Sequence, residues 1–349
     1  MRYLTICQWM VAAALVPASI LSEDKLAVCA TTPDLGALIR EVGGDAVELT
    51  VLAKGPEDPH YLEPRPSFIV TLHDADLFAV TGAELEIGWA PLLVKRARNS
   101  SIIPGGTGHF DASSAVELIG KPAPGADRSA GDLHALGNPH FLLDPINGWR
   151  VARAIARKLA ELRPARASDF DTRLGDFERR LVARLFGAAI AAANGERSAD
   201  VLRLVDLGGV AKAAEVLGKQ GEAGTAGAAE ATEGWIGALA SLRSRSFIAD
   251  HQLWEYFAAR FDLKVAGYME PKPGIAPSTR HIAALAEQMK REKIELIGSS
   301  PYFDTAHARI LARATGARVA ELAHQPGSRV GTESYLEMID HNVREFAGR

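Results

Sequence analysis

Short apolar runs alternate with helical patterns in both halves of this chain, and this alternation is the strongest constraint on its fold. The expected strands span residues 26–31, 47–52 and 75–81 in the first half, and 246–250, 264–268, 294–299 and 318–322 in the second. Strands that alternate with helices at this spacing call for a parallel sheet covered by helices on both faces. We therefore predict an α/β fold of two lobes, each a mainly parallel sheet with flanking helices.

A long amphipathic helical stretch separates the two halves. Its large apolar residues fall on one face from residue 147 to residue 185, and Pro164 should break or kink the helix near Arg163. Residues 187–234 are rich in Ala, Gly and Glu, which is typical of an insertion with loose helices and a mobile tip at 221–227. The expected division is a signal peptide (1–22), an N-terminal lobe (23–145), a connecting backbone helix (146–187) and a C-terminal lobe (188–349, with the insertion at about 188–234).

The N-terminus has the pattern of an export signal. Arg2 precedes an apolar run at 10–16, and the small residues Ala18 and Ser22 offer two cleavage points. The run is shorter than the roughly 20 apolar residues that a membrane span needs. We therefore expect an exported protein. Cys29 would be the one cysteine left after cleavage, so we expect no disulfide and a buried strand position for Cys29.

Four histidines lie at loop positions that suit a ligand site. His60 follows the second strand in a loop restricted by Pro56 and Pro59, while His251 and His324 follow strands of the second half. His140 lies in the loop GDLHALGNPHFLLDP between the halves. Loops at the carboxyl ends of parallel strands are where α/β proteins bind ligands. Imidazoles without cysteine suit Zn²⁺, whereas Mn²⁺ or Fe²⁺ would be favoured if carboxylates contributed. We predict a divalent metal ion as the ligand.

The remaining histidines are not expected to be metal ligands, and the charge of the chain limits its possible partners. His73 falls in a helix, and His109, His281, His307 and His341 have polar, surface-like positions, so we expect none of the five to bind the metal. The net charge of −4 has no cluster of Lys and Arg behind it, which argues against nucleic acid as a partner. A small ligand is therefore the better expectation.

Five segments agree in order and spacing with one family. They are VCATTPDLGALIREVGGDAVELTVLAKGPEDPHYLEPRPS, TGAELEIGWAPLL, GDLHALGNPHFLLDP, ADHQLWEYFAARFDL and GTESYLEMIDHNV. Through them the chain resembles the periplasmic solute-binding proteins of zinc and manganese ABC importers, over almost the whole mature chain apart from the insertion. The resemblance implies two α/β lobes joined by one long backbone helix, with the metal in the cleft between them.

The resemblance also implies roles for individual residues and a partner. Carried over by position, His60 and His140 are ligands from the N-terminal lobe, and His251 is the first ligand from the C-terminal lobe. The partner implied by the resemblance is a membrane ABC permease, which would receive the ion. We expect the binding protein itself to be a monomer.

The fourth ligand position departs from the family pattern. Relatives usually have Leu-Asp-Pro after the last strand, whereas this chain has Leu322-Ala323-His324, so alanine replaces the aspartate ligand. The segment SSP at 299–301 likewise lacks the glutamate that some relatives carry. We expect His324 to supply the fourth ligand, with His134 or a water as the alternatives. Histidine ligands favour zinc, since Mn²⁺ sites usually want more oxygen.

Two other functions share parts of this pattern. Three histidines with an open coordination position are also how catalytic zinc sites are built, as in a periplasmic zinc hydrolase. The sequence has no HExxH helix and no evident general base in these motifs, so we expect no enzyme. The missing aspartate leaves a second alternative, a binder of a metal chelate or of a small organic ligand.

Overall fold

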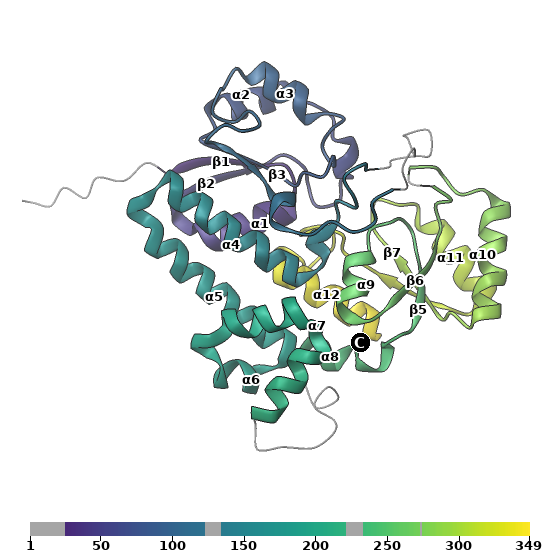
Figure 1. Ribbon diagram of the computed structural model, residues 1–349. Helices are drawn as coiled ribbons and strands as arrows, with labels where there is room; N and C mark the ends of the chain where they lie inside the picture. Colours follow the sequence, from purple (N-terminus) through teal and green to yellow (C-terminus); the bar gives the residue numbers. More distant parts are fainter. Residues whose placement is uncertain (1–24, 123–133, 221–232, 273) are drawn as a thin grey trace, which may run out of the picture.

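Two four-stranded sheets form the centres of the two halves (Figure 1). The computed structural model describes residues 25–122, 134–220, 233–272 and 274–349. The first sheet has the order β2-β1-β3-β4, with β1 (Leu26–Ala30), β2 (Val47–Val51), β3 (Leu77–Val80) and β4 (His109–Asp111). The second has the order β6-β5-β7-β8, with β5 (Ser246–Ala249), β6 (Lys264–Tyr268), β7 (Leu296–Ser299) and β8 (Arg318–Glu321). All neighbouring strands are parallel, which confirms the predicted fold class.

The strand β4 is the one strand of these sheets that the sequence did not predict. It has three residues, of which only Phe110 is buried, so the sequence contains no apolar run that would predict this strand. His109 pairs with Phe78 of β3 and is half-buried, which corrects its expected place on the surface. Burial lowers the pKa of His109 below its ordinary value, although the charge of Asp111 opposes this.

Helices α1 (Pro33–Gly43), α2 (Pro66–Asp74) and α3 (Ala90–Ala97) flank the first sheet. The helix α1 begins with Pro33 in its first turn and ends at Gly43, and the φ of 53° at the following residue, Gly44, favours glycine. Its buried residues include Leu35, Leu38 and Ile39, as the helical repeat of apolar residues predicts. This apolar face belongs to the main hydrophobic core, which also contains buried residues of the connecting helices.

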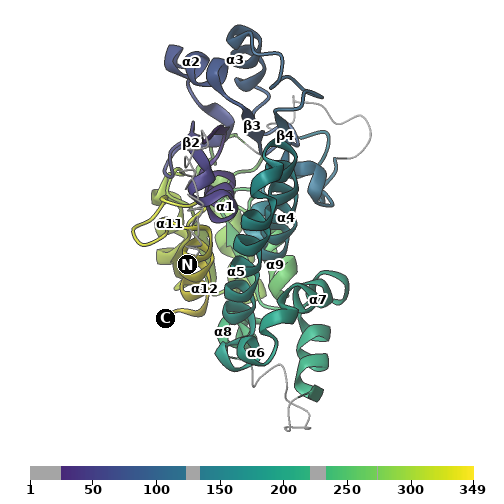
Figure 2. The ribbon, with the colours of Figure 1, turned by 90° about the vertical axis from the view of Figure 1, so that its left-hand side faces the viewer.

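The connection between the halves is divided at Pro164, as the sequence predicts. It consists of α4 (Pro145–Leu162), a 3-10 turn (Pro164–Arg166) and α5 (Ala167–Phe186). The two helices lie side by side in both views (Figures 1 and 2). The helix α5 contacts both halves, because Arg180 pairs with Glu41 of α1 while Arg184 pairs with Asp340 of α12 (Tyr335–Ala347).

The insertion contains α6 (Ala188–Ala193), α7 (Ser198–Gln220) and the start of α8 (Gly234–Ala238). The helix α7 is kinked at Gly209, and its first part packs against α5 with Val201, Leu202 and Val205 buried. The described part of the insertion is therefore joined to the core. The expected tip at 221–227 and the expected signal peptide at 1–22 lie outside the described residues.

The second sheet is covered by α9 (Glu255–Phe261), α10 (Thr279–Glu292), α11 (Thr305–Thr315) and α12. The helix α12 begins with a capping box of Ser334 and Glu337, and its last turn places Phe346 against Phe247 and Phe257. Further 3-10 turns span Gly44–Ala46, Pro59–Tyr61, Ala112–Ala115, Phe141–Leu143, Gly195–Arg197 and Ala240–Leu242. Within the described ranges, none of the helices is both long and apolar enough to cross a membrane.

Candidate metal centre

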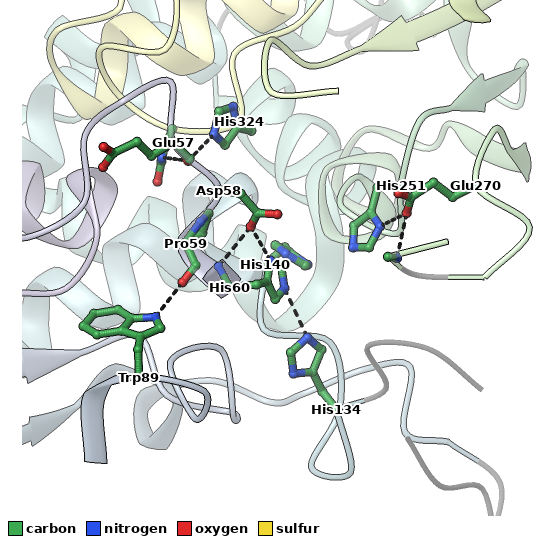
Figure 3. Close-up of polar contacts among 12 residues, drawn as sticks. Glu57, Asp58, Pro59, His60, Trp89, His134, His140, His251, Glu270 and His324 are labelled. Carbon is green, nitrogen blue, oxygen red and sulfur yellow. Dashed lines mark hydrogen bonds and ion pairs between the residues drawn. The ribbon is translucent and has the colours of Figure 1, made fainter. Parts of the chain in front are cut away.

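Three of the predicted histidines meet in one cluster between the two halves (Figure 3). One ring nitrogen each of His60, His140 and His251 lies within 4.8 Å of the other two. The ring centroids are 5.2 Å apart for His60 and His140, 5.7 Å for His140 and His251, and 5.9 Å for His60 and His251. Two nitrogen ligands of a tetrahedral zinc ion lie about 3.3 Å apart. The cluster therefore needs only a small contraction to hold one ion.

The same local arrangement orients His60 and His140. Oδ1 of Asp58 accepts the backbone N–H of His60 at 2.9 Å and lies 2.7 Å from His60 Nδ1. Oδ1 of Asn138 makes the same two contacts with His140, each at 2.9 Å. Because both oxygens can only accept hydrogen bonds, each Nδ1 carries the proton and each Nε2 offers its lone pair. In both loops a residue two positions earlier therefore prepares an imidazole for a metal ion.

A carboxylate from a different strand end orients His251. Nδ1 of His251 lies 2.6 Å from Oε2 of Glu270, which follows β6, and the same oxygen accepts the backbone N–H of Gly274. The ring stacks on Phe303 with the centroids 5.4 Å apart, and His251 is only 5% exposed. All three histidines thus have an acceptor at Nδ1, so Nε2 is the nitrogen of each ring that could bind the ion, and that of His60 also contacts His134.

These surroundings change the proton affinities of the rings in opposite directions. Burial lowers the pKa of His140 well below its ordinary value, and the charges of the neighbouring histidines lower it further. Burial also lowers the pKa of His251, but the hydrogen bond and charge of Glu270 outweigh it, so the net pKa is raised. Burial raises the pKa of Asp58, but the contacts with His60 outweigh this and the net pKa is lowered. Asp58 and Glu270 therefore make the rings of His60 and His251 better electron donors to a metal ion.

His134 lies next to His60 on the outer side of the cluster (Figure 3). Its Nε2 is 3.2 Å from Nε2 of His60, and its ring centroid is 6.4 Å from that of His140. Together with His60, Glu84 and Trp89 it lines a pocket of about 300 Å³. His134 thus contacts one of the three clustered histidines without joining their group.

His324 also lies outside the three-histidine group. Its Nε2 is 3.4 Å from the carbonyl oxygen of Glu57, and its ring meets that of Tyr302 edge-on with the centroids 4.5 Å apart. It lines a small cavity together with His140 and Tyr302. Burial lowers the pKa of His324 to about 4, so the ring is neutral at neutral pH. The structure therefore places His324 close to the cluster but not within it.

The histidines that were expected to be non-ligands stay apart from the cluster. Rings bonded to backbone carbonyls are those of His73 with Ala97, His281 with Tyr268 and His341 with Glu321. His307 lies partly exposed on α11, and His109 lies in β4. In the part of the chain that the structure describes, the group that could hold a metal contains none of these five. Cys29 is a buried residue of β1, as predicted, and burial raises its pKa to about 12.

The sequence reasoning missed the residues that orient the rings. Asp58 and Asn138 each precede a ligand candidate by two positions, so the repeated spacing of an acidic or amide residue and a histidine was a detectable signal. Glu270 follows a predicted strand end, but its contact with His251 spans two loops. Only the folded structure shows that pairing.

Comparison with known proteins relates this geometry to a family. The chain matches the family model described as zinc-uptake complex component A, periplasmic, over residues 28–185 and 212–348. The manganese ABC transporter substrate-binding lipoprotein PsaA of Streptococcus pneumoniae is 28% identical over 163 residues, which are 46% of this chain and 49% of that protein. The zinc-binding lipoprotein AdcA of Streptococcus pneumoniae serotype 4 is 22% identical over 330 residues, 93% of this chain and 55% of that protein. The chain spans about half the length of these curated relatives.

Solved structures share the fold over nearly the whole chain. A crystal structure of ZnuA superimposes with a TM-score of 0.62 at 21% identity, covering 93% of this chain and 99% of that one. The Cd-bound periplasmic metal-binding protein from Candidatus Liberibacter asiaticus gives a TM-score of 0.64 at 16% identity, with 93% and 99% covered. The family model and these relatives are named as metal-uptake binding proteins, which agrees with the expectation that the chain is not an enzyme. Because the family model spans both halves and its gap falls in the insertion, the chain belongs to the ZnuA family, the periplasmic component A of zinc-uptake complexes.

Proposed function

We propose that the protein is a periplasmic solute-binding protein that captures a zinc ion between its halves and delivers it to a membrane ABC permease. The observation that carries this proposal is the convergence of His60, His140 and His251, each with Nδ1 held by an acceptor. Relatives named for zinc and for manganese are both similar to this chain. The nitrogen donor set favours zinc, because manganese prefers oxygen ligands. The signal pattern of the N-terminus supports export.

We propose His324 as the fourth ligand, through Nδ1. Its Nε2 faces the carbonyl oxygen of Glu57, which can only accept, so Nε2 carries the proton and Nδ1 offers a lone pair. Nδ1 is buried and has no hydrogen-bond partner, as is true of Nε2 of His140, and both residues line one cavity. A buried nitrogen without a partner is costly, and a metal ion would satisfy both. A direct bond requires the loops to approach one another when the ion binds.

The metal carried by the native protein tests the proposed function. Protein purified from the periplasm should contain about one zinc ion per chain by elemental analysis. In competition titrations the purified protein should bind Zn²⁺ more tightly than Mn²⁺, since its donors are nitrogens. Protein that carries manganese, or that prefers Mn²⁺ in the titration, contradicts the assignment of zinc. Protein that binds neither ion contradicts the proposed function.

The fourth ligand can be tested at positions 323 and 324. His324→Ala should weaken zinc binding by more than about tenfold, because a lost ligand nitrogen is not replaced by packing. Ala323→Asp restores the carboxylate that relatives carry, and should raise affinity for Mn²⁺ relative to Zn²⁺. Calorimetric titration at neutral pH measures both effects. His307→Ala, on the partly exposed face of α11, is the control and should bind zinc as the parent does. Parent-like binding by His324→Ala would assign the fourth position to water or His134.

Zinc binding should weaken as the pH falls, because protons compete for the ring nitrogens. The raised pKa of His251 means that this ring is protonated first, so the loss begins above the ordinary histidine value of about 6.5. Glu270→Gln removes the charge that raises this pKa. We expect the onset of the loss to shift to lower pH, with affinity at neutral pH weaker by about 10–100-fold. Zinc titrations from pH 5 to 8 measure both changes. Glu287→Gln, on an exposed face of α10, is the control. An unchanged onset of the loss in Glu270→Gln contradicts the role of Glu270.

A further inference from the structure

The loop that carries His60 is held by a glutamine from the opposite half. Nε2 of Gln325 lies 3.1, 3.0 and 2.9 Å from the carbonyl oxygens of Lys54, Gly55 and Glu57. Gln325 follows β8 and is only 2% exposed, so water does not compete for its amide. The three acceptors belong to the short stretch between β2 and His60. One side chain of the second half thus gathers three backbone carbonyls of the first.

A second contact joins the same two segments without side chains. A Cβ atom on Gly55 would lie 2.2 Å from the carbonyl carbon of Gly327 and 2.6 Å from the backbone nitrogen of Ser328. No side chain fits there, so the backbones of the two loops touch directly. The His60 loop is therefore pressed against the loop after β8 at one point and hydrogen-bonded to it at another.

The other two clustered histidines are tied to each other by hydrogen bonds between the His140 loop and the second half. Nδ2 of Asn138 donates to the carbonyl oxygen of Gln252 at 2.9 Å, and the hydroxyl of Tyr256 donates to the carbonyl oxygen of Asn138 at 2.8 Å. Gln252 directly follows His251, and Asn138 orients His140. The separation of His140 and His251 is thus fixed by local bonds. The place of His60 relative to both depends on how its loop is held.

We infer that Gln325 is a positioning residue of the metal centre. By fixing residues 54–57 to the second half, its amide sets the distance of His60 from His140 and His251 without touching the ion. The inference rests on the proposed function, because it takes His60 as a ligand. Removing the amide would leave three carbonyls without their shared donor and free the loop to move away. The geometry that three ligands of one ion require would then be met less often.

Zinc affinity of Gln325→Met is the first part of the test. Methionine keeps the length of the side chain but removes the donor, so we expect zinc binding to weaken by about 10–100-fold, as for other outer-shell losses. Competition with a chromophoric chelator measures the affinity. Gln288→Met is the matched control. Nε2 of Gln288 likewise donates to a backbone carbonyl, that of Ala266 at 3.1 Å, but this bond lies wholly within the second half. This variant should stay within about twofold of the parent.

A double-mutant cycle separates positioning from a general structural effect. If Gln325 acts through His60, Gln325→Met should change zinc affinity by less than about twofold in a His60→Ala background. An equal weakening in both backgrounds would overturn the inference. Gly55→Ala serves as a second variant if Gln325→Met does not fold, and it should show the same dependence on His60. Parent-like binding by Gln325→Met rejects this inference alone, whereas a parent protein that binds no zinc rejects the proposed function.

Discussion

Replacing His251 with alanine is expected to weaken zinc binding by more than about 100-fold. The loss of an outer-shell partner already costs about 10–100-fold, and a ligand contributes more than the group that orients it. His251 is 5% exposed and packed against Phe303, so no nearby side chain moves readily into its place. The same change would leave Glu270 without the ring that it contacts at 2.6 Å. His60→Ala and His140→Ala should weaken zinc binding comparably, because each removes one nitrogen from the same cluster.

Isothermal titration calorimetry with zinc chloride measures this prediction, and chelator competition extends it to tight binding. His109→Ala is the control, because His109 is a half-buried histidine of β4 outside the cluster. It should bind zinc as the parent does. If two of the three cluster variants kept the affinity of the parent protein, the ligand assignment would be wrong.

Replacing Arg260 with methionine is expected to reduce the free energy of unfolding by about 3–5 kcal/mol. Nε and Nη2 of Arg260 donate to the two carboxylate oxygens of Asp144 at 2.8 and 2.7 Å, and the two side chains are 13% and 6% exposed. Asp144 also caps α4 by accepting the backbone N–H of Ile146. Without the guanidinium, a buried carboxylate would keep its charge and lose its partner. The pair also joins the start of α4 to α9, so its loss should loosen the contact between the halves.

Urea unfolding of the metal-free protein measures this change. Arg203→Met is the matched control, because Arg203 pairs with Asp200 on α7 with 52% and 67% of the side chains exposed. Its loss should cost less than about 1 kcal/mol, since water screens an exposed pair. Adding Asp144→Asn to Arg260→Met should restore part of the stability by removing the unpaired charge. A parent-like unfolding midpoint in Arg260→Met would show that the pair contributes nothing measurable.

The elements of the fold were predictable where their signals are local. The helix α11 (Thr305–Thr315) has such signals at both ends, because Asp304 caps its start and Gly316 adopts a φ of 78° after its end. The strand β4 escaped prediction because two of its three residues are polar. The break in the connecting stretch could be predicted from Pro164, but the packing of α5 against α4 could not be predicted from the sequence. Such packing depends on contacts between residues far apart in the sequence.

The candidate site was predictable for a different reason and to a smaller extent. His60 and His251 follow strands, and strand ends of facing parallel sheets bring their loops together. The place of His140 came from the loop between the halves and from the resemblance to a family. Glu270 and the position of His324 were not accessible in this way, because they depend on how two loops settle against each other. The role of Gln325 could not be predicted from the sequence either, since its three acceptors lie about 270 positions earlier in the chain.

The acceptors that orient the rings also set the electrical balance of the centre. Asp58 and Glu270 are carboxylates, whereas Asn138 is neutral, so the groups behind the three rings bring two negative charges. The two positive charges of a divalent ion bound by uncharged nitrogens would be balanced by these two carboxylates, which lie behind the rings. A monovalent ion would leave one negative charge uncompensated, and a trivalent ion would leave one positive charge in a largely buried place. The centre can thus discriminate between ions by valence as well as by size.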